Sequence, residues 1–405
     1  MKILVLNSGS ATQKTSLYEI AAVPPADPPA PLWEGLIEWQ DSCADIRTSG
    51  ATGVRVRDRV QINSRQQVTE QLLSDLWTGA APLLKGPSEI GMVGHRIVHG
   101  GKEFSEPAVV TPALKSAIER MTVFAPLHNP AGLEGIEIIE QILGGIPQVA
   151  VFDTAFHRSL PESAAVYPGP YEWVARGIRR YGFHGINHQY CAERAARLLG
   201  CDLQSLKLVT CHLGNGCSLA AVRDGRSIDT TMGFTPLEGL MMGTRSGSVD
   251  PGILTYLLRE DRLTAEQLDD LLNKNSGLAG ISGISNDMRE IVSAMKSGNP
   301  RAKLAFDIFI HRLTSLTGSM VAVLGGVDAL VFTAGIGENS SEVRAAACSN
   351  LEFLGVRLDP AKNSRSSNDC DISASDSRVR ILIVRANEDW AIARACWTLV
   401  HSNHL

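Results

Sequence analysis

Residues 2–20 read KILVLNSGSATQKTSLYEI, and residues 207–223 read KLVTCHLGNGCSLAAVR. In each stretch a short apolar run rich in strand-forming residues ends at a glycine-containing turn, and a second strand pattern follows. The same strand–turn–strand plan therefore occurs twice, about 205 residues apart, which is half of the 405-residue chain. Such a repeat predicts a duplicated domain.

Further strand and helix patterns follow these two hairpins. Apolar runs at 148–152 and 328–333 predict buried strands. A helical stripe at 68–77 and a second one after Asn129, a candidate N-cap before Pro130, predict amphipathic helices. Mixed strands and helices joined by long connections predict an α/β architecture.

Local signals also predict one helix start and two loops. Thr264 and Gln267 have the spacing of a capping box. Residues 21–31 contain five prolines in eleven positions, which predicts an extended loop between two strands. Residues 363–377 are rich in serine and aspartate, which predicts an exposed loop.

The composition limits the classes of partner. The chain is 44% hydrophobic and 20% charged, which excludes wholesale disorder. Its net charge of −5 gives no large positive field for nucleic acid or an anionic membrane, so an anionic ligand needs a few placed arginines. The eight cysteines form no C-x-x-C pair, and the first apolar run is too short for a secretory signal. We therefore expect a soluble cytoplasmic protein with reduced thiols.

Standard nucleotide motifs are missing from the sequence. No G-x-x-x-x-G-K-[ST] P-loop and no protein-kinase H-R-D and D-F-G pair occurs. The run Gly335-x-Gly337-x-x-Ser340 follows a predicted strand and opens a helix. Its amides could therefore face an anion, or it could be only a tight turn.

Histidines and arginines gather in short glycine clusters. Seven of the ten histidines lie between residues 95 and 212, and Arg96 and Arg245 lie in clusters of the same kind. An arginine beside glycines can present its planar fork to phosphate or carboxylate oxygens, or it can be a solvated surface charge. Zinc is disfavoured, because no H-E-x-x-H occurs and His184 with His188 has no evident third ligand.

Carboxylates at strand ends or in tight loops form another candidate group: Asp153, Asp287 and Glu388. Together with Asn7 they could hold Mg²⁺, directly or through water. The alternative is that each one is an N-cap or turn residue.

Taken together, these clusters resemble the acetate kinase family over nearly the whole chain. The matching segments stand in family order: Asn7-Ser8-Gly9-Ser10 with Lys14, GHRIVHGG at 94–101, APLHNP at 125–130, FDTAFH at 152–157, RYGFHG at 180–185, HLGNG at 212–216, MGFTPLEG at 232–239, MGTRSG at 242–247, FTAGIGEN at 332–339 and Asn387-Glu388.

The resemblance implies a duplicated actin-like (ribonuclease H-like) ATPase fold, with two domains around a central cleft. One domain would span residues 1–152 plus a C-terminal helix at about 390–405. The other would span residues 153–389 and carry most of the nucleotide site. It also implies a homodimer and reversible, direct in-line phosphoryl transfer from ATP to acetate, giving ADP and acetyl phosphate, with Mg²⁺ (or Mn²⁺ in its place).

Site roles carry over from the family by position. The catalytic set is Asp153, His184 and Arg245. The resemblance implies Arg96 as the acetate ligand, and Val98, Leu127, Phe183 and Pro236 as the acyl pocket. It implies ATP contacts from Lys14, His212, Leu213, Gly214, Asn215, Gly216, Asp287, Met288, Arg289, Gly335, Ile336, Gly337, Glu338 and Asn339. The metal ligands would be Asn7 and Glu388.

A few positions depart from the family pattern, among them Ala11, Ser248, Ala386 and Asp389. None of them removes a catalytic residue.

Three rival functions share the fold: a propionate or butyrate kinase, a sugar kinase, and an actin-like or chaperone-like nucleotide switch. A sugar kinase needs an aspartate base for a hydroxyl, and a switch needs a peptide-binding domain or filament surfaces. The two arginines in glycine clusters favour a small anionic acceptor.

Overall fold

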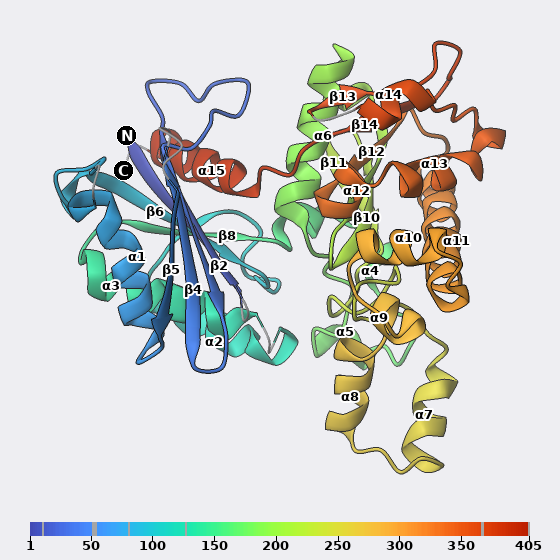
Figure 1. The fold of residues 1–405 in the computed structure, drawn as a ribbon, viewed down its shortest axis with the longest axis horizontal. Coiled ribbons are helices and arrows are strands. Elements are labelled where there is room, and N and C mark those ends of the chain that lie inside the picture. Colours follow the sequence, from blue (N-terminus) through green and yellow to red (C-terminus); the bar gives the residue numbers. More distant parts are fainter. Residues whose placement is uncertain (10–11, 51–54, 80–81, 126–127, 366–367, 404–405) are drawn as a thin grey trace. The chain divides into compact units, whose positions relative to one another are not determined.

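The computed structural model describes residues 1–9, 12–50, 55–79, 82–125, 128–365 and 368–403 (Figure 1). The chain forms two compact units. The first comprises residues 1–155 and 387–405, and the second comprises residues 156–386. The limits predicted for independently folding domains stay a prediction.

The first unit is built on an eight-stranded sheet with the order β5-β4-β3-β2-β1-β6-β8-β7. Its strands are β1 (Lys2–Ser8), β2 (Thr12–Glu19), β3 (Trp33–Trp39), β4 (Cys43–Gly50), β5 (Arg55–Gln61), β6 (Ile90–Ile97), β7 (Ala108–Val109) and β8 (Gln148–Phe152). Its longer helices are α1 (Arg65–Thr78), α2 (Pro112–Arg120), α3 (Asn129–Leu143) and α15 (Glu388–Asn403).

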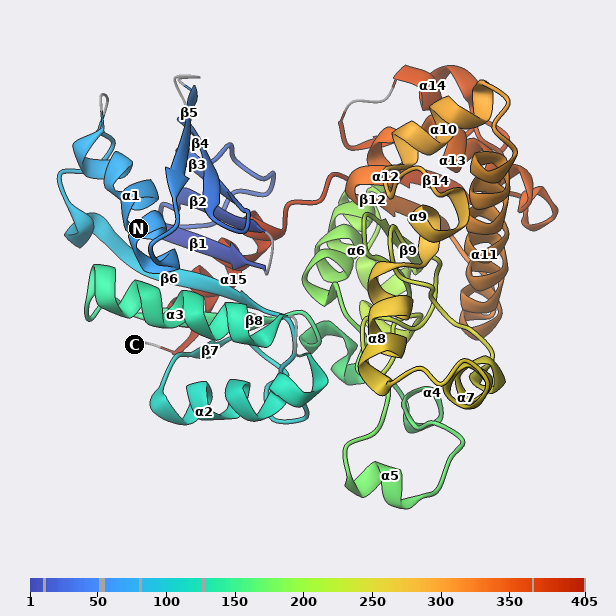
Figure 2. The ribbon, with the colours of Figure 1, turned by 60° about the horizontal axis from the view of Figure 1, so that its bottom comes forward.

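The central strand β1 is covered on both faces. Ile3, Leu4 and Val5 are each fully buried, which is the pattern of a strand inside a sheet with helices on either side. Helices α3 and α15 provide that cover from opposite faces, as Figure 2 shows. The close approach of α15 depends on Gly94 in β6, because a β-carbon there would lie 2.6 Å from Cys396 Sγ.

The second unit holds a six-stranded sheet with the order β11-β10-β9-β12-β14-β13. Its strands are β9 (Lys207–Leu213), β10 (Cys217–Arg223), β11 (Arg226–Thr230), β12 (Ala329–Thr333), β13 (Cys370–Asp371) and β14 (Arg380–Ile383). Its helices are α4 (Glu162–Ala165), α5 (Glu172–Ala175), α6 (Gly185–Leu199), α7 (Pro251–Arg259), α8 (Ala265–Lys274), α9 (Gly277–Ser282), α10 (Met288–Lys296), α11 (Pro300–Leu324), α12 (Ala334–Asn339), α13 (Ser341–Ser349) and α14 (Pro360–Arg365).

The two sheets repeat one topology, which confirms the predicted duplication. In the first unit β1 pairs antiparallel with β2 and parallel with β6, which is parallel to β8. In the second unit β9 pairs antiparallel with β10 and parallel with β12, which is parallel to β14. The hairpins quoted at 2–20 and 207–223 are therefore equivalent elements of two α/β units.

Most local predictions are confirmed. The capping box of Thr264 and Gln267 is present, with both reciprocal hydrogen bonds formed. Residues 21–31 form a connection without helix or strand between β2 and β3. All eight cysteines are free thiols. Among the helices that the structure describes, none has the length and apolar character needed to cross a membrane.

The prediction that Asn129 caps its helix is wrong. Helix α3 begins at Asn129 itself, and His128 occupies the N-cap position. The Asn129 side chain turns to the end of β6 instead, where it accepts from His99 N and donates to His99 O, each at 3.0 Å. Both polar groups of this buried side chain are hydrogen-bonded, which ties the start of α3 to the segment after β6.

The exposed loop predicted at 363–377 is also wrong in part. The segment contains the end of α14 and the whole of β13, and Asn363, Ile372, Ser373 and Ser377 are buried. Its polar side chains bond backbone inside the fold: Ser373 Oγ accepts from Ile381 N at 2.7 Å. Composition alone could not distinguish such internal hydrogen bonds from solvation.

Candidate active site

Four predicted site residues of the first unit meet at one edge of its sheet. Asn7 lies near the end of β1, Arg96 near the end of β6, Asp153 follows β8, and Glu388 opens α15. Strands β1, β6 and β8 are parallel, so their carboxyl ends lie at the same edge. This topology brings together residues that are up to 381 positions apart (388 − 7).

The Arg96 guanidinium is the centre of this group. It donates from Nη1 to Asn7 Oδ1 at 3.1 Å and from Nε to Asp153 Oδ2 at 3.0 Å. Glu388 Oε2 lies 3.9 Å from Arg96 Nε. Burial opposes the charge of Arg96, but the carboxylates of Asp153 and Glu388 attract it and raise its pKa above the ordinary value. Arg96 therefore stays charged, as a ligand for an anion must.

The oxygen side chains of this edge suit a hard divalent cation. Asn7, Asp153 and Glu388 offer one amide and two carboxylate groups, which is the ligand chemistry that Mg²⁺ prefers. Within the described residues, no set of three or more His, Cys, Asp and Glu side chains is close enough to hold a metal without other ligands. Mg²⁺ commonly keeps several waters and uses one or two carboxylates plus phosphate, so the residues fit that mode.

Neighbouring predicted residues extend the same edge. Lys14 lies directly across the β1–β2 hairpin from Asn7, and its side chain is exposed. Val98 is buried just after β6. Leu127, which the family resemblance places in the acyl pocket, lies outside the described residues. Asp389, next to Glu388, is buried and accepts from Ser16 Oγ at 2.8 Å, and burial raises its pKa.

In the second unit a pair of histidines forms the core of the predicted site. His184 stands at the N-cap of α6 with φ 56°, a left-handed conformation that is uncommon outside glycine. Its ring stacks on that of His212, at the end of β9, with 3.9 Å between centroids and 11° between planes. Strained backbone of this kind is typical of functional sites.

Arg245 reaches the same place across the glycine turn. A β-carbon built on Gly216 would lie 3.4 Å from His184 Cε1 and 3.5 Å from Arg245 Nη1, so the two side chains flank the same position beside Gly216. Arg245 Nη1 donates to Pro236 O at 3.0 Å. Burial lowers the pKa of Arg245 from its ordinary value. Buried Phe183, directly before His184, completes the predicted set here.

Two polar side chains behind the stacked pair were missed by sequence reasoning. Ser218 Oγ lies 2.9 Å from His184 Nδ1, and Asn187 Nδ2 lies 2.7 Å from His212 Nδ1. The register of the β9–β10 hairpin is a sequence signal that could have identified Ser218, because Ser218 pairs directly with His212. Residues opposite each other on paired strands share a face of the sheet.

The glycine turn at 214–216 is braced by the loop that follows Met242. Asn215 O accepts from Gly243 N at 3.0 Å, and Asn215 Oδ1 accepts from Asn286 Nδ2 at 3.2 Å. A β-carbon on Gly243 would lie 2.0 Å from Asn215 Oδ1. Leu213, the last residue of β9, is buried.

The residues predicted on the adenosine side have structural contacts of their own. Asp287 is the N-cap of α10, accepts from Arg289 N at 2.8 Å and pairs with the mostly exposed Arg289 side chain, whereas Met288 is buried. Gly335, Ile336, Gly337, Glu338 and Asn339 form α12, directly after β12. Glu338 Oε1 accepts from Ala386 N at 2.8 Å, and burial raises the pKa of Glu338.

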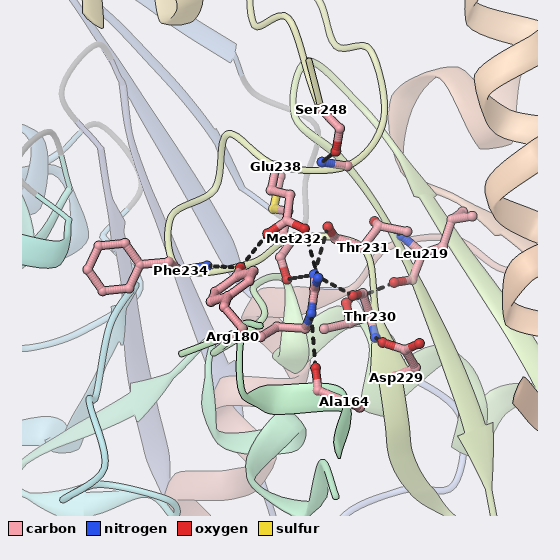
Figure 3. Close-up of polar contacts among 12 residues, drawn as sticks. Ala164, Arg180, Leu219, Asp229, Thr230, Thr231, Met232, Phe234, Glu238 and Ser248 are labelled. Atoms are coloured by element: carbon pink, nitrogen blue, oxygen red, sulfur yellow. Dashed lines mark hydrogen bonds and ion pairs between the residues drawn. The ribbon is translucent and has the colours of Figure 1, made fainter. Parts of the chain in front are cut away.

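A clamp around Arg180, also missed from sequence, holds the segment that carries Pro236 (Figure 3). Arg180 Nη1 donates to the carbonyl oxygens of residues 230–232 at 2.9–3.2 Å, and Nη2 donates to Glu238 Oε1 at 2.7 Å. Tyr167 OH donates to the other oxygen of Glu238 and accepts from Phe234 N at 2.9 Å. Glu238 and Tyr167 attract the guanidinium against the effect of burial, and the pKa of Arg180 is raised.

The far end of that segment is held by Ser248, one of the positions where the sequence departs from the family pattern. Gly239 N donates to Ser248 Oγ, and Ser248 N donates to Gly239 O, each at 3.0 Å (Figure 3). The serine hydroxyl thus supplies an acceptor for the backbone of the loop. The departure keeps the loop anchored.

Known proteins share this chain's sequence and fold over their whole length. The acetokinase family model matches residues 2–394. A curated acetate kinase of Cyanothece sp. is 57% identical over 405 residues, covering 100% of this chain and 99% of that protein. A crystal structure of Porphyromonas gingivalis acetate kinase has a TM-score of 0.91 and 40% identity, covering 98% of this chain and 99% of that one.

A second solved structure bears on the choice of acid. A propionate kinase from Francisella tularensis subsp. tularensis has a TM-score of 0.89 and 39% identity, covering 97% of this chain and 98% of that one. The fold is therefore common to both named activities, while the sequence match to the Cyanothece protein is much higher. The chain belongs to the acetokinase family.

Proposed function

We propose that this protein is a kinase that transfers the γ-phosphoryl group of ATP to acetate, giving acetyl phosphate and ADP, and that the reaction is reversible. The observation that carries the proposal is the acetokinase match over residues 2–394, which includes every proposed catalytic side chain. Acetate is preferred to propionate as the substrate, because the relative at 57% identity is named acetate kinase, whereas the named propionate kinase is 39% identical.

Phosphoryl transfer needs positioning and charge neutralisation more than covalent chemistry. Arg96, charged and half enclosed by carboxylates, would orient the acetate carboxylate. His184 and Arg245, which flank the same position beside Gly216, would donate to the equatorial phosphoryl oxygens as their charge develops. Acetate is already ionised at neutral pH, so Asp153 has no proton to remove from it.

Mg²⁺ is a further part of the proposal. Asn7 and Glu388 would hold the ion directly or through water, with Asp153 beside them. When bound, Mg²⁺ neutralises phosphate oxygens and orients them. The glycine turn 214–216 with Lys14 and His212 would contact phosphates, and 287–289 with 335–339 would contact the nucleoside.

A hydroxylamine trap tests this function. The purified protein is incubated with ATP, Mg²⁺ and hydroxylamine, and acyl hydroxamate is measured with acetate, propionate and butyrate. Because a pocket discriminates by about 1–3 kcal/mol per methylene, acetate should exceed propionate by about tenfold or more in kcat/KM. Replacing buried Val98 by alanine should narrow this gap, whereas no hydroxamate from acetate would refute the proposed activity.

We also propose that the protein is cytoplasmic and forms a homodimer. Helix α7 has no buried residue although it carries Ile253, Tyr256 and Leu258, whose exposures are 47%, 57% and 41%. Apolar side chains that cluster on a surface are typical of protein interfaces. Light scattering should give twice the mass of 43.5 kDa. A Tyr256→Glu variant should shift that mass toward one copy if α7 forms the interface.

A further inference from the structure

The two stacked histidines at the centre of the second unit have opposite hydrogen-bonding partners behind them. His184 and His212 lie 3.9 Å apart, face to face. Two imidazolium rings at that distance repel each other, so the pair is stable with at most one positive charge. The groups behind the rings determine which ring carries it.

Behind His184 a chain of hydrogen bonds runs to a backbone carbonyl. His184 Nδ1 contacts Ser218 Oγ at 2.9 Å, Ser218 Oγ contacts His188 Nε2 at 2.7 Å, and His188 Nδ1 contacts Thr210 Oγ1 at 2.7 Å. Thr210 Oγ1 donates to Ala220 O at 3.5 Å. All four residues of the chain belong to α6 or its N-cap, or to the β9–β10 hairpin.

Counting protons gives the direction of this chain. In the direction that uses all four contacts, the single proton of Thr210 points toward Ala220 O, which can only accept. His188 is buried and neutral, since burial lowers its pKa well below the ordinary value, and it therefore donates from Nδ1 to Thr210. Its Nε2 then accepts the proton of Ser218, and the Ser218 oxygen is left as an acceptor for Nδ1–H of His184.

Behind His212 the arrangement is reversed. Asn187 donates from Nδ2 to His212 Nδ1 at 2.7 Å and contacts Thr333 Oγ1 with the same amide nitrogen at 3.4 Å. Cys191 Sγ donates to Asn187 Oδ1 at 3.5 Å, which agrees with this orientation of the amide. A nitrogen that accepts a hydrogen bond holds no proton, so His212 is protonated only at Nε2 and is neutral.

We propose that the hydrogen bonds behind the two rings determine which ring of the stacked pair is charged. Ser218 stabilises His184 as an imidazolium, and Asn187 keeps His212 neutral. Ser218 and His188 are positioning residues, because they act through His184. The inference rests on the proposed function, in which His184 donates to a phosphoryl group. A charged donor forms stronger hydrogen bonds to phosphate oxygens than a neutral one.

Other charged and titratable groups bear on this assignment. Within the described residues His184 faces His212 from β9 and Arg245 across Gly216, with His188 of its own helix behind Ser218. The positive charge of Arg245 disfavours a positive charge on His184, whereas an incoming phosphate favours that charge. The hydrogen bond to Ser218 adds a fixed contribution in favour of the charge on His184.

Nuclear magnetic resonance of protein labelled with ¹⁵N in its histidines tests the proposal without reference to activity. His184→Gln and His212→Gln identify the two sets of ring signals. On lowering the pH, His184 should become doubly protonated first, while His212 Nδ1 keeps its lone pair. Protonation of His212 before His184, or of both together, would overturn the assignment.

A variant series links the contact to catalysis. Ser218→Ala removes the acceptor, so the titration of His184 and the alkaline decline of kcat should both move down by about one pH unit. Ser218→Thr, which keeps the hydroxyl, should stay near the wild type. The matched control is Ser373→Ala, which removes a buried hydroxyl of the same unit that accepts from Ile381 N at 2.7 Å and should leave the His184 titration in place.

The outcomes separate this inference from the proposed function. If the wild type forms acetyl phosphate but Ser218→Ala leaves both titrations unchanged, the charge assignment is wrong and the function stands. If the wild type forms no acetyl phosphate, the proposed function fails, and the titration order of His184 and His212 still decides the assignment. That order is measured on the wild type, so it does not depend on the stability of any Ser218 variant.

Discussion

At the scale of single residues, the side chains of His184 and Arg245 both lie beside Gly216. A β-carbon built on Gly216 would be in van der Waals contact with both, so the ring and the guanidinium flank one position. In many enzymes, donors held in place around the charge that develops in the transition state contribute more to the rate than any other effect.

His184→Ala and Arg245→Ala should each lower kcat by about 10²-fold or more and change nucleotide binding little, because their contribution arises mainly in the transition state. Steady-state kinetics together with ATP titration by calorimetry would measure both effects. Arg223→Ala, an exposed arginine on β10, is the matched control. Near-wild-type kcat in both site variants would show that neither side chain contacts the reacting group.

Glu388→Gln should raise the Mg²⁺ concentration needed for half-maximal rate, since the variant removes one anionic anchor and keeps the shape of the side chain. The rate is measured over a Mg²⁺ titration at fixed ATP. Exposed Glu137 on α3 provides the control Glu137→Gln. An unchanged titration in Glu388→Gln would assign Glu388 to the support of Arg96 instead.

Motifs identify the site residues that occupy turns and strand ends. They do not identify the side chains that hydrogen-bond to those residues from behind. Arg96, Asp153 and His184 stand in distinctive local sequences. Ser218 and Asn187 do not, because their roles depend on which strand and helix face each other. The prediction for Asn129 is wrong for a related reason: its partner, His99, is 30 residues away in sequence.

At the scale of elements, the segment 230–248 is shaped by polar contacts more than by apolar packing. Arg180 and Glu238 tie its first half to the strand that precedes it, and Ser248 closes the second half. The carbonyl of Pro236 then holds Arg245. The clamp thus positions Arg245, a proposed catalytic arginine, without taking part in the reaction itself.

Gly233→Ala should destabilise the protein, because a β-carbon there would lie 1.7 Å from Glu238 Oε2 and 2.0 Å from Tyr167 OH. Overpacking of this kind costs about 1–3 kcal/mol. In contrast, Gly318→Ala in the middle of α11 meets nothing within 4 Å and should stabilise by about 0.5–1 kcal/mol. Thermal unfolding of the two variants should shift in opposite directions, and a shift of the same sign would refute the clamp geometry.

Strands and hairpins are the most predictable elements. The two strand–turn–strand patterns predict β1, β2, β9 and β10, the apolar runs at 148–152 and 328–333 predict β8 and β12, and all six strands are present. The prediction for 363–377 is wrong in part, because its serines and asparagine bond backbone and a buried arginine instead of water. Arg344 Nε, for example, donates to Asn363 Oδ1 at 2.7 Å.

At the scale of the whole molecule, one topology occurs twice, and each copy presents its polar residues at the same edge. In the first unit Asn7, Arg96 and Asp153 lie at the carboxyl ends of β1, β6 and β8. In the second unit His212 lies near the end of β9, and Gly335 lies shortly after β12. Ligands bind at this edge in open α/β sheets, so a duplicated hairpin signal already indicates where each unit carries its chemistry.

The central claim is that phosphoryl transfer links ATP with acetate in both directions. The most direct measurement is ATP formation by the purified protein from acetyl phosphate, ADP and Mg²⁺, followed by luciferase luminescence. The account predicts ATP that depends on all three components, and at least about 10²-fold less of it with His184→Ala. Absence of ATP with the wild type, or ATP formation that does not require acetyl phosphate, would contradict it.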